Sequence, residues 1–276
     1  MFLIINLSIE PKEVSIIIKD FIKTYVDNSG CTGVVIGLSG GVDSAVVAKL
    51  CRQVLGKKNT RCVFLPNDTT PDLDFKHLDL IIKKLDLLCE KKEITNIVNE
   101  IDKYCIIKPD KLAKANIKAR IRMTLLFEYA NMTNSLVCGT SNKSELLVGY
   151  FTKYGDGGVD IQPIGDLYKT QVFELARFLK IPKEIILKPP AAGLWKGQTD
   201  EKELGISYKN LDIILAGLEY KMNFNEIAKK AGVKISDVER IHKMRIKSQH
   251  KRRAPLIPKI GIRTVGIDWR SPIQIG

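Results

Sequence analysis

Residues 33–50 read GVVIGLSGGVDSAVVAKL, and this stretch decides the fold. It opens with residues 34–36 (VVI), an apolar β-branched run that is typical of a buried parallel strand. Residues 39–41 (SGG) follow, where glycine lets the backbone turn sharply and approach a ligand closely. A helix with apolar residues at helical spacing then begins near Asp43. Because a helix N-terminus carries free N–H groups and the positive end of the helix dipole, the stretch predicts a phosphate-binding loop.

The loop is neither of the two commonest nucleotide-binding motifs. It lacks the lysine of GxxxxGK[ST], and it does not match GxGxxG. SGGVDS instead resembles the pyrophosphate loop of the ATP pyrophosphatases, enzymes that cut ATP into AMP and pyrophosphate. That resemblance implies that Asp43 holds a magnesium ion and that Ser39 and Ser44 donate hydroxyl groups to phosphate. The plainer alternative is a glycine-rich turn without a ligand.

The residues around the loop predict a doubly wound, Rossmann-like parallel sheet of five strands flanked by helices. We expect the strands at residues 34–36, 61–65, 93–98, 135–139 and 159–164. Helices are expected at residues 10–28, 43–54, 72–88, 110–131, 168–179, 207–216, 225–231 and 236–247. The ligands of such a sheet lie at the carboxyl ends of its strands. Residues 1–276 are predicted to form one domain, with its core at about residues 10–190 and a helical part at about 191–276.

The charge balance favours an anionic ligand. The chain of 276 residues has 44 Lys and Arg against 31 Asp and Glu, and the net charge of +13 suits nucleic acid, a membrane surface or small phosphorylated substrates. Six cysteines without a CxxC pair indicate free thiols in a reducing compartment rather than a zinc site. No apolar run approaches the roughly 20 residues of a membrane span, and the first residues do not read as a signal peptide. We therefore expect a cytoplasmic protein without a membrane partner.

The long helix at residues 110–131 carries a basic stripe. Its members share one helix face and are Lys111, Lys114, Lys118 and Arg122. The stripe is either a solvated face or, if it lies at the strand ends, a source of an arginine that contacts a phosphate or carboxylate bidentately. Helical spacing alone favours the solvated face.

Residues 139–145 (GTSNKSE) follow the fourth strand as SGGVDS follows the first. Thr140 and Glu145 would then lie beside the same ligand. Glu145 stands three residues after Asn142, so it could be the acid of a capping box. It could equally be a second carboxylate ligand of magnesium.

Three later features carry charge at expected loop positions. Residues 149–160 (GYFTKYGDGGVD) form a glycine-rich charged loop of the kind that usually carries function, although a plain hairpin is possible. Lys169 lies at a helix start, where it opposes the dipole; an anionic partner or a solvent-exposed side chain would each explain this. Residues 250–253 (HKRR) are a basic cluster, either a solvated tail or a weak nucleic-acid patch.

Together these motifs resemble the short, ammonia-using NAD synthetases. SGGVDS, NIKARIRM, GYFTKYGDGGVD, GLWKGQTDEKELG and SQHKRRAP occur in that family's order over nearly the whole chain. The resemblance implies binding of ATP by Gly37, Leu38, Ser39, Gly40, Gly41, Val42, Asp43, Ser44, Thr140, Lys169 and Ala191. It implies contacts with deamido-NAD by Arg122, Lys153, Asp160, His250 and Lys251. Magnesium would be held by Asp43 and Glu145, and catalytic roles fall on Asp43, Lys169 and Asp160.

The chain departs from the family pattern at Ala191, where the family usually has Thr or Ser. Any ATP contact there must come from the backbone. The family reaction is the ATP-dependent amidation of deamido-NAD with ammonia through an adenylate, releasing AMP and pyrophosphate. The resemblance further implies a homodimer with the dinucleotide partly across its interface. No glutaminase pattern is present, so ammonia is expected as the direct donor.

Two other readings compete with this one. Another ATP pyrophosphatase, such as a GMP synthetase subunit or a tRNA-modifying enzyme, would share the loop. The tRNA version would use the basic charge, but no aromatic-interleaved basic run supports nucleic acid as a partner. A nucleotide sensor without turnover is the other alternative, which Asp43, Glu145 and Lys169 argue against.

Overall fold

A four-stranded parallel sheet forms the centre of the molecule. The computed structural model describes residues 5–191, 193, 195 and 197–265. Its strands are β1 (Gly33–Gly37), β2 (Thr60–Phe64), β3 (Leu88–Lys91) and β4 (Ser135–Cys138). They pair in the order β3-β2-β1-β4, so β2 and β4 flank β1 on opposite sides. The chain thus leaves β1 in one direction and returns on the other side, which is the arrangement of a doubly wound sheet.

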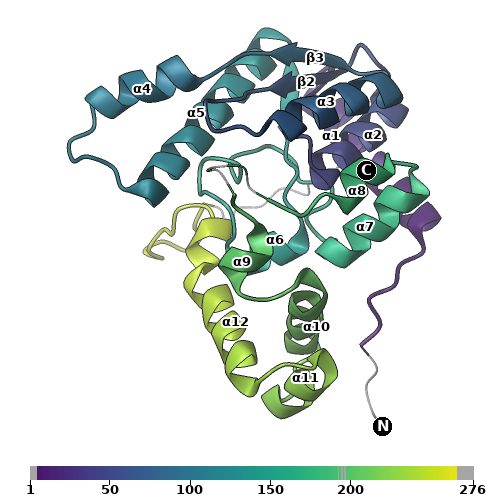
Figure 1. Ribbon diagram of the computed structural model, residues 1–276, viewed down its shortest axis with the longest axis vertical. Helices are drawn as coiled ribbons and strands as arrows, with labels where there is room; N and C mark the ends of the chain where they lie inside the picture. Colours follow the sequence, from purple (N-terminus) through teal and green to yellow (C-terminus); the bar gives the residue numbers. More distant parts are fainter. Residues whose placement is uncertain (1–4, 192, 194, 196, 266–276) are drawn as a thin grey trace.

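Helices cover both faces of this sheet (Figure 1). Those of the first 190 residues are α1 (Pro11–Ser29), α2 (Val42–Leu55), α3 (Asp72–Leu85), α4 (Thr95–Lys103), α5 (Lys111–Met132), α6 (Lys143–Val148), α7 (Lys169–Phe178) and α8 (Lys183–Leu187). They are followed by α9 (Asp200–Leu204), α10 (Tyr208–Glu219), α11 (Phe224–Ala231), α12 (Ile235–Lys247) and a 3₁₀ helix, η1 (Gln249–Arg252).

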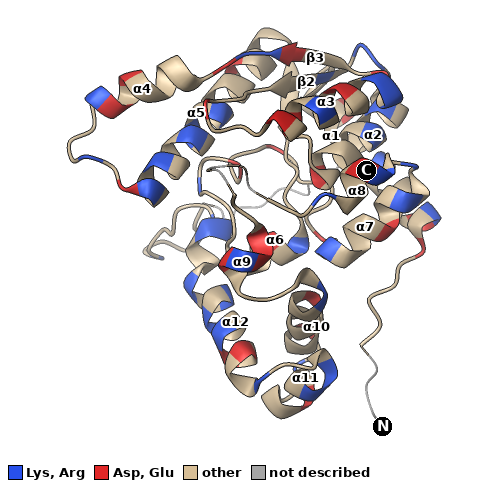
Figure 2. Ribbon diagram, viewed as in Figure 1, with Lys and Arg blue, Asp and Glu red and all other residues tan. Residues whose placement is uncertain are grey.

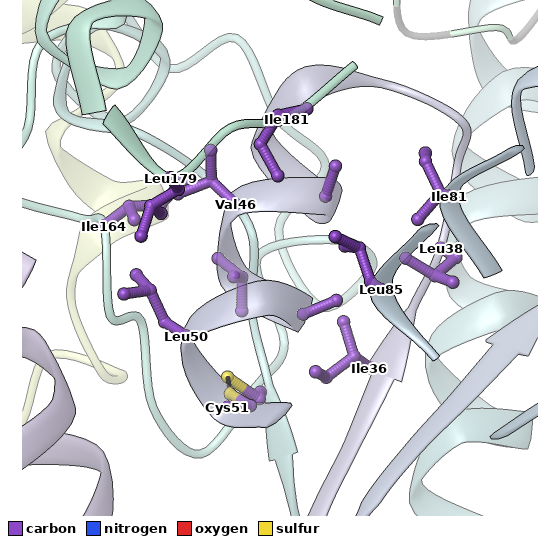
Figure 3. Packing of buried hydrophobic residues seen from close by; sticks show 14 of the residues in the cluster. Ile36, Leu38, Val46, Leu50, Cys51, Ile81, Leu85, Ile164, Leu179 and Ile181 are labelled. Atoms are coloured by element: carbon purple, nitrogen blue, oxygen red, sulfur yellow. Dashed lines mark hydrogen bonds between the residues drawn. The ribbon is translucent and has the colours of Figure 1, made fainter. Parts of the chain in front are cut away.

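The two faces of β1 belong to different hydrophobic cores. Val34 and Ile36 pack with α1, α2, α3 and α7 in one cluster, whereas Val35 packs with α5 in another. All three side chains are fully buried because side chains alternate along a strand and both faces are covered. Figure 3 shows Ile36 and the α2 residues Val46 and Leu50 in the first of these cores. Helix α2 is therefore fixed against the sheet, and so is the loop that precedes it.

The prediction of a fifth strand at residues 159–164 is wrong. Among the described residues this segment contributes one isolated parallel bridge, between Ile161 and Cys138. Two features limit its pairing: Pro163 has no N–H group to donate, and the side chain of Asp160 accepts the N–H of Val137 at 2.7 Å. A side chain thus replaces a backbone partner at this edge.

The predicted strand at residues 93–98 is also wrong. The third strand is β3, a few residues earlier, and Thr95 already begins α4. Ile94, Val98 and Ile101 stand four and three residues apart, which is the spacing of a helix face. Ile94 and Val98 are buried beneath that helix, as the helical interpretation requires.

The predicted C-terminal helices are confirmed as α10, α11 and α12. They share a separate core with α6, built around Leu211, Ile214 and Val238. In Figure 1 they form the lower part of the molecule, with α6 and α9 between them and the sheet. That residues 1–276 act as one domain stays a prediction.

The composition led to expectations about cysteines, charged residues and membrane spans. All six cysteines are free, as predicted. Figure 2 shows Lys and Arg spread over many helices, with Asp and Glu beside them on α3 and α4. Within the described part of the chain, no helix combines the length and apolar character that a membrane crossing requires. The expected cytoplasmic location stays a prediction.

Candidate functional site

A cavity of about 440 Å³ opens at the carboxyl ends of β1 and β4. This is the point where the strand order reverses, and ligands of doubly wound sheets bind there. Residues 37–39 and 41–44 of the SGGVDS region line it from one side, and residues 137–141 line it from the other. The second segment includes Thr140, and Ala191 belongs to the lining as well. The structure therefore brings together both loops that follow these strands.

The SGGVDS loop is shaped for close approach to a ligand. Gly40 has a φ of +74°, and a Cβ atom there would stand 3.0 Å from the carbonyl oxygen of Asp74. The Ser39 hydroxyl accepts the N–H of Gly41 at 3.3 Å, and the Ser44 hydroxyl donates to the Gly41 carbonyl at 3.0 Å. Helix α2 begins at Val42 without a side-chain cap. The first N–H groups of this 14-residue helix thus face the cavity side without a capping side chain, as an anion site requires.

Lys169 lies between two carboxylates at this corner. Its Nζ is 2.5 Å from Asp43 Oδ2 and 3.5 Å from Glu145 Oε1, and its side chain is 2% exposed. Burial alone would lower the pKa of Lys169, but Asp43 and Glu145 outweigh it and hold the pKa above its ordinary value. Burial raises the pKa of Glu145 above its ordinary value, with Lys169 opposing the rise and Asp43 adding to it. Lys169 is therefore a fixed positive charge facing the phosphate loop.

Both alternatives for Glu145 depend on one side chain with two oxygens. The capping box is present: the Asn142 side chain accepts the N–H of Glu145 at 3.0 Å, and the N–H of Asn142 donates to Glu145 Oε2 at 3.4 Å. The other oxygen, Oε1, faces Lys169. Asn142 Nδ2 also donates to Asp43 Oδ1 at 3.1 Å. The cap thus positions Glu145 beside Asp43 instead of excluding it from the site.

A buried carboxylate explains why a lysine begins α7. Asp212 of α10 is fully buried, and its Oδ2 accepts the N–H and the hydroxyl of Thr170 at 2.9 and 2.8 Å. Its Oδ1 accepts the Ser144 hydroxyl at 2.5 Å, and Ser144 Oγ in turn accepts the N–H of Lys169. Burial raises the pKa of Asp212, and these hydrogen bonds oppose the rise. The anionic partner expected at this helix start is therefore supplied by α10 as well as by Asp43.

The basic stripe of α5 is divided among several environments. Arg122 lines the cavity; its Nε donates to the Leu65 carbonyl at 2.9 Å and its Nη2 to Asn67 Oδ1 at 3.1 Å. The other terminal nitrogen, Nη1, has no hydrogen-bond partner within the described ranges. Lys118 is buried, and Lys114 pairs with Asp102 at 2.7 Å. The solvated-face interpretation is wrong for Arg122, which is held with one edge available to a ligand.

The structure separates the remaining predicted dinucleotide contacts. Lys251 lines the cavity and donates to the carbonyls of Gly149 and Phe151 at 2.8 and 2.9 Å. Lys153, Asp160 and His250 are not part of the cavity lining. Lys153 Nζ donates to the His250 carbonyl at 2.8 Å. The carboxylate of Asp160 is engaged by the N–H of Val137.

Sequence reasoning missed an acidic wall of the cavity. It is formed by Asp200 and Glu203 of α9 together with Tyr150 and Gln198. The Tyr150 hydroxyl donates to Glu203 Oε2 at 2.6 Å. The signal was the QTDEKE stretch, where two acids three residues apart fall on one face of a short helix.

A largely buried ion pair in the cavity lining was also missed. Lys188 Nζ is 2.6 Å from Asp74 Oδ1, and the two side chains are 13% and 10% exposed. Both residues line the cavity. They are 114 positions apart, and no local pattern in the sequence joins them.

Asp43 and Glu145 have the donor chemistry of a magnesium site. Both offer carboxylate oxygens to one point beside the phosphate loop. Magnesium is usually bound in nucleotide enzymes by one or two carboxylates together with substrate phosphates. No group of three or more His, Cys, Asp or Glu suited to a metal occurs in the described part of the chain.

Comparison with known proteins identifies close relatives. A family model described as NAD synthase matches residues 14–255. The protein of Sulfolobus acidocaldarius named NH(3)-dependent NAD(+) synthetase is 45% identical over 256 residues, which covers 92% of this chain and 91% of that protein. The structure of an NMN synthetase from Francisella tularensis superposes with a TM-score of 0.81 at 35% identity, covering 92% of this chain and 100% of that one. An NH3-dependent NAD synthetase from Campylobacter jejuni gives a TM-score of 0.78 at 32% identity, covering 91% and 100%.

Proposed function

The chain belongs to the NAD synthase family, and we propose that its cavity catalyses the ATP-dependent amidation of deamido-NAD with ammonia. The reaction gives NAD, AMP and pyrophosphate, so the chain is a ligase that forms a C–N bond. The observation that carries the proposal is the corner of Asp43, Glu145 and Lys169 at the SGGVDS loop. A phosphate loop, two carboxylates and a buried ammonium group at one point suit the splitting of ATP at its α-phosphorus.

The reaction has two steps. The nicotinate carboxylate of deamido-NAD attacks the α-phosphorus of ATP, and the bond from that phosphorus to the bridging oxygen breaks to release pyrophosphate. The nitrogen of ammonia then attacks the carbonyl carbon of the adenylate; the C–O bond to AMP breaks and one proton is lost. The carboxylate requires this activation because oxide is a poor leaving group whereas AMP is a good one.

The chain's own residues supply charge and position. The amide groups at the start of α2 and the Ser39 and Ser44 hydroxyls would bind the phosphates of ATP. Lys169 would neutralise negative charge that develops as pyrophosphate leaves. Because its ammonium group is buried and held by two carboxylates, it needs little reorganisation when that charge develops.

We include magnesium and ATP in the proposed ligand set. Asp43 and Glu145 would hold the ion, which when bound would neutralise phosphate charge and orient the polyphosphate. Thr140 and the backbone at Ala191 would complete the ATP site, since both residues line the cavity. Arg122 and Lys251 would contact deamido-NAD from the same cavity.

A homodimer is the proposed assembly. Large apolar side chains are exposed around the turn between α4 and α5; they are Ile101, Tyr104, Ile106, Ile107 and Leu112. Contiguous exposed apolar surface of this kind often marks a protein interface. Lys153 and His250, outside the lining of the cavity within one chain, would then contact the part of the dinucleotide that lies toward the interface. Light scattering on the protein and on an Ile106→Glu, Ile107→Glu variant tests this: the proposal requires a dimer that the two substitutions weaken.

A second acceptor is favoured by one observation. The structural relative from Francisella tularensis is an NMN synthetase, and it covers this chain as fully as the Campylobacter jejuni NAD synthetase does. Nicotinate mononucleotide carries the same carboxylate as deamido-NAD but lacks the adenylate half. The same corner could therefore activate it.

One assay separates the acceptors and the rival reactions. Release of AMP and pyrophosphate is measured in ammonium buffer with no acceptor, with deamido-NAD and with nicotinate mononucleotide. Strict dependence on deamido-NAD supports the main proposal, and a preference for the mononucleotide replaces it. Dependence on xanthosine monophosphate or tRNA would instead identify another ATP pyrophosphatase. Glutamine in place of ammonium serves as the donor control, and efficient amide formation from glutamine alone would contradict the proposed donor.

A further inference from the structure

Asp200 is the one acidic side chain of the described cavity lining with a buried carboxylate oxygen that nothing satisfies. Asp200 is 4% exposed. Its Oδ2 accepts the Tyr208 hydroxyl at 3.0 Å, whereas its Oδ1 is buried without a hydrogen-bond partner among the described residues. An unsatisfied buried carboxylate oxygen is costly and is rare in native structures. A hydrogen-bond donor that does not belong to the described chain would therefore satisfy this atom.

The oxygen belongs to the reaction cavity. The Tyr208 hydroxyl that contacts Asp200 also lies 3.5 Å from Glu145 Oε1, so one hydroxyl joins the acidic wall to the magnesium corner. The backbone fixes Asp200 as well, because its N–H donates to the Pro190 carbonyl at 3.0 Å. A ligand at Oδ1 would therefore meet a side chain that two hydrogen bonds position, within the same cavity as the activated carboxylate.

The charge of this wall favours a small cation. Asp43 and Glu145 have Lys169 as a direct cationic partner, whereas no cationic side chain of the described chain forms an ion pair with Asp200. Glu203 lies on the same short helix and takes its hydrogen bonds from Tyr150 and Gln198. Lys169 acts on Asp200 through space without an ion-pair contact, so the recess still lacks a direct cationic partner and can attract a small cation.

We propose that Asp200 Oδ1 binds the ammonium ion that supplies the amide nitrogen, and that the bound ion gives up one proton to solvent before its nitrogen attacks as ammonia. The inference rests on the proposed function, which requires this substrate. Ammonium carries four N–H donors and a single charge, so one free carboxylate oxygen and neighbouring neutral oxygens such as the Tyr150 hydroxyl match it. Magnesium matches less well, because it demands octahedral coordination and retains several waters.

This places the nitrogen donor away from Asp160, the residue first expected to position it. The Asp160 carboxylate accepts the N–H of Val137 and lies outside the cavity lining. Asp200 has the reverse properties: it lines the cavity and keeps one oxygen unused. Asp160 thus has a structural role at the edge of the sheet, whereas Asp200 is the residue that would bind the nitrogen donor.

The test compares two carboxylate-to-amide substitutions. Asp200→Asn removes the charge and keeps the shape, and Asp166→Asn makes the same change on a side chain that is 96% exposed. For Asp200→Asn the KM for ammonium should rise at least about tenfold, the usual weight of a charge-assisted hydrogen bond. The KM values for ATP and deamido-NAD, and kcat at saturating ammonium, should stay within about twofold, and Asp166→Asn should match the parent protein. An unchanged KM for ammonium, or an equal rise in the KM for ATP, overturns the proposal.

A measurement on the unaltered protein keeps the proposal testable if Asp200→Asn does not fold. Potassium resembles ammonium in charge and size but has no nitrogen to transfer. It should raise the apparent KM for ammonium competitively without changing kcat, at constant ionic strength set with a large organic cation. Absence of competition overturns the proposal. The proposed function fails separately, if the parent protein forms no amide from deamido-NAD with ammonium at all.

Discussion

The two sides of the cavity are built by different means. The inner corner comprises Ser39, Asp43, Glu145 and Lys169, which start or precede helices packed on the sheet. The outer rim comprises residues 149–160 and 248–252, which are loops and a 3₁₀ turn. Charges of the inner corner contact one another directly, whereas Lys153 and Lys251 of the outer rim donate to backbone carbonyls. The inner corner therefore has a fixed electrostatic field, and the outer rim has a fixed backbone shape.

The largest contrast between the two sides should come from their lysines. Lys169→Met leaves Asp43 and Glu145 without their counter-ion, and removing one partner of a buried pair costs about 3–5 kcal/mol of stability. We expect kcat/KM for AMP formation to fall by about 10³ as well, because a preorganised charge at the phosphates is lost. Steady-state kinetics and urea unfolding of the same variant separate the two effects.

The matched control is Lys153→Met, on the outer rim. Its Nζ contacts a backbone carbonyl and not a carboxylate, so the loss in kcat/KM should stay below about tenfold. Equal losses in the two variants would show that lysine charges on both sides stabilise the transition state. The inner corner and the outer rim would then not differ in how they act.

The second prediction concerns what holds the inner corner in place. Asp212→Ala removes three hydrogen bonds accepted by a fully buried carboxylate, at Ser144 and Thr170. At about 1 kcal/mol each, the free energy of unfolding at pH 7 should fall by about 3 kcal/mol. The exposed Asp166→Ala should change it by less than about 1 kcal/mol.

The same residue gives a pH dependence with a defined sign. Burial raises the pKa of Asp212 above its ordinary value, so between about pH 4 and the raised pKa the folded state binds more protons than the unfolded state. Its contribution to the free energy of unfolding therefore decreases as pH rises through that window. Asp212→Ala should cost more at pH 4 than at pH 7, as measured by urea unfolding at both values. A larger cost at pH 7 would contradict the raised pKa.

The difference between the two sides also explains what the sequence could predict. The inner corner depends on patterns local in the chain: a strand followed by SGG, and Asn142 followed three residues later by Glu145. Such patterns fix the loop and the cap before tertiary contacts are considered. The rim segments were marked by their glycine and charge content, but their ligand was named by resemblance alone, and Lys153, Asp160 and His250 lie outside the cavity lining. Their roles stay predictions.

Tertiary contacts decided the features that sequence reasoning missed. Asp74 and Lys188 pair across 114 positions, and Asp212 reaches α7 from α10. Residues 159–164 have the apolar composition of a strand, but Pro163 and the Asp160 side chain limit their pairing to one bridge. At residues 93–98 the error was of another kind, because the helical spacing of Ile94, Val98 and Ile101 was already visible in the sequence.

The third prediction concerns Arg122, which stands between the two sides. Arg122→Gln should raise the KM for deamido-NAD about 10- to 100-fold, the usual range for a lost charged hydrogen bond. The KM for ATP should change by less than about threefold. Arg120→Gln is the control, because Arg120 is exposed on the same helix and donates to the Lys153 carbonyl at 3.3 Å. If the KM for ATP rises as much as that for the dinucleotide, Arg122 belongs to the inner corner instead.

A smaller effect should follow from loosening the outer rim. Lys251→Met removes two donors to the carbonyls of Gly149 and Phe151, so the loop that begins there should lose its fixed shape. We expect the KM for deamido-NAD to rise about fivefold, from roughly 1 kcal/mol of lost hydrogen bonding. Among the described residues of one chain only the carbonyl of His250 is engaged, so an effect of His250→Ala on the KM for deamido-NAD requires the proposed dimer. A comparable loss for His250→Ala would show that this side chain reaches the dinucleotide, as a dimeric site allows.

The smallest effect is expected from a gain elsewhere in the cavity lining, at Ala191. Ala191 lines the cavity at a position where the family resemblance implies a hydroxyl, so Ala191→Ser should supply a donor to ATP. A single neutral hydrogen bond to a ligand contributes about 0.5–1.5 kcal/mol, and an exposed position takes the low end, so the KM for ATP should fall about two- to threefold. Ala191→Val adds side-chain bulk without a donor and should give no gain. If both variants improve ATP binding equally, the gain comes from packing, and this part of the cavity lining depends on shape, as the outer rim does, rather than on a donated hydrogen bond.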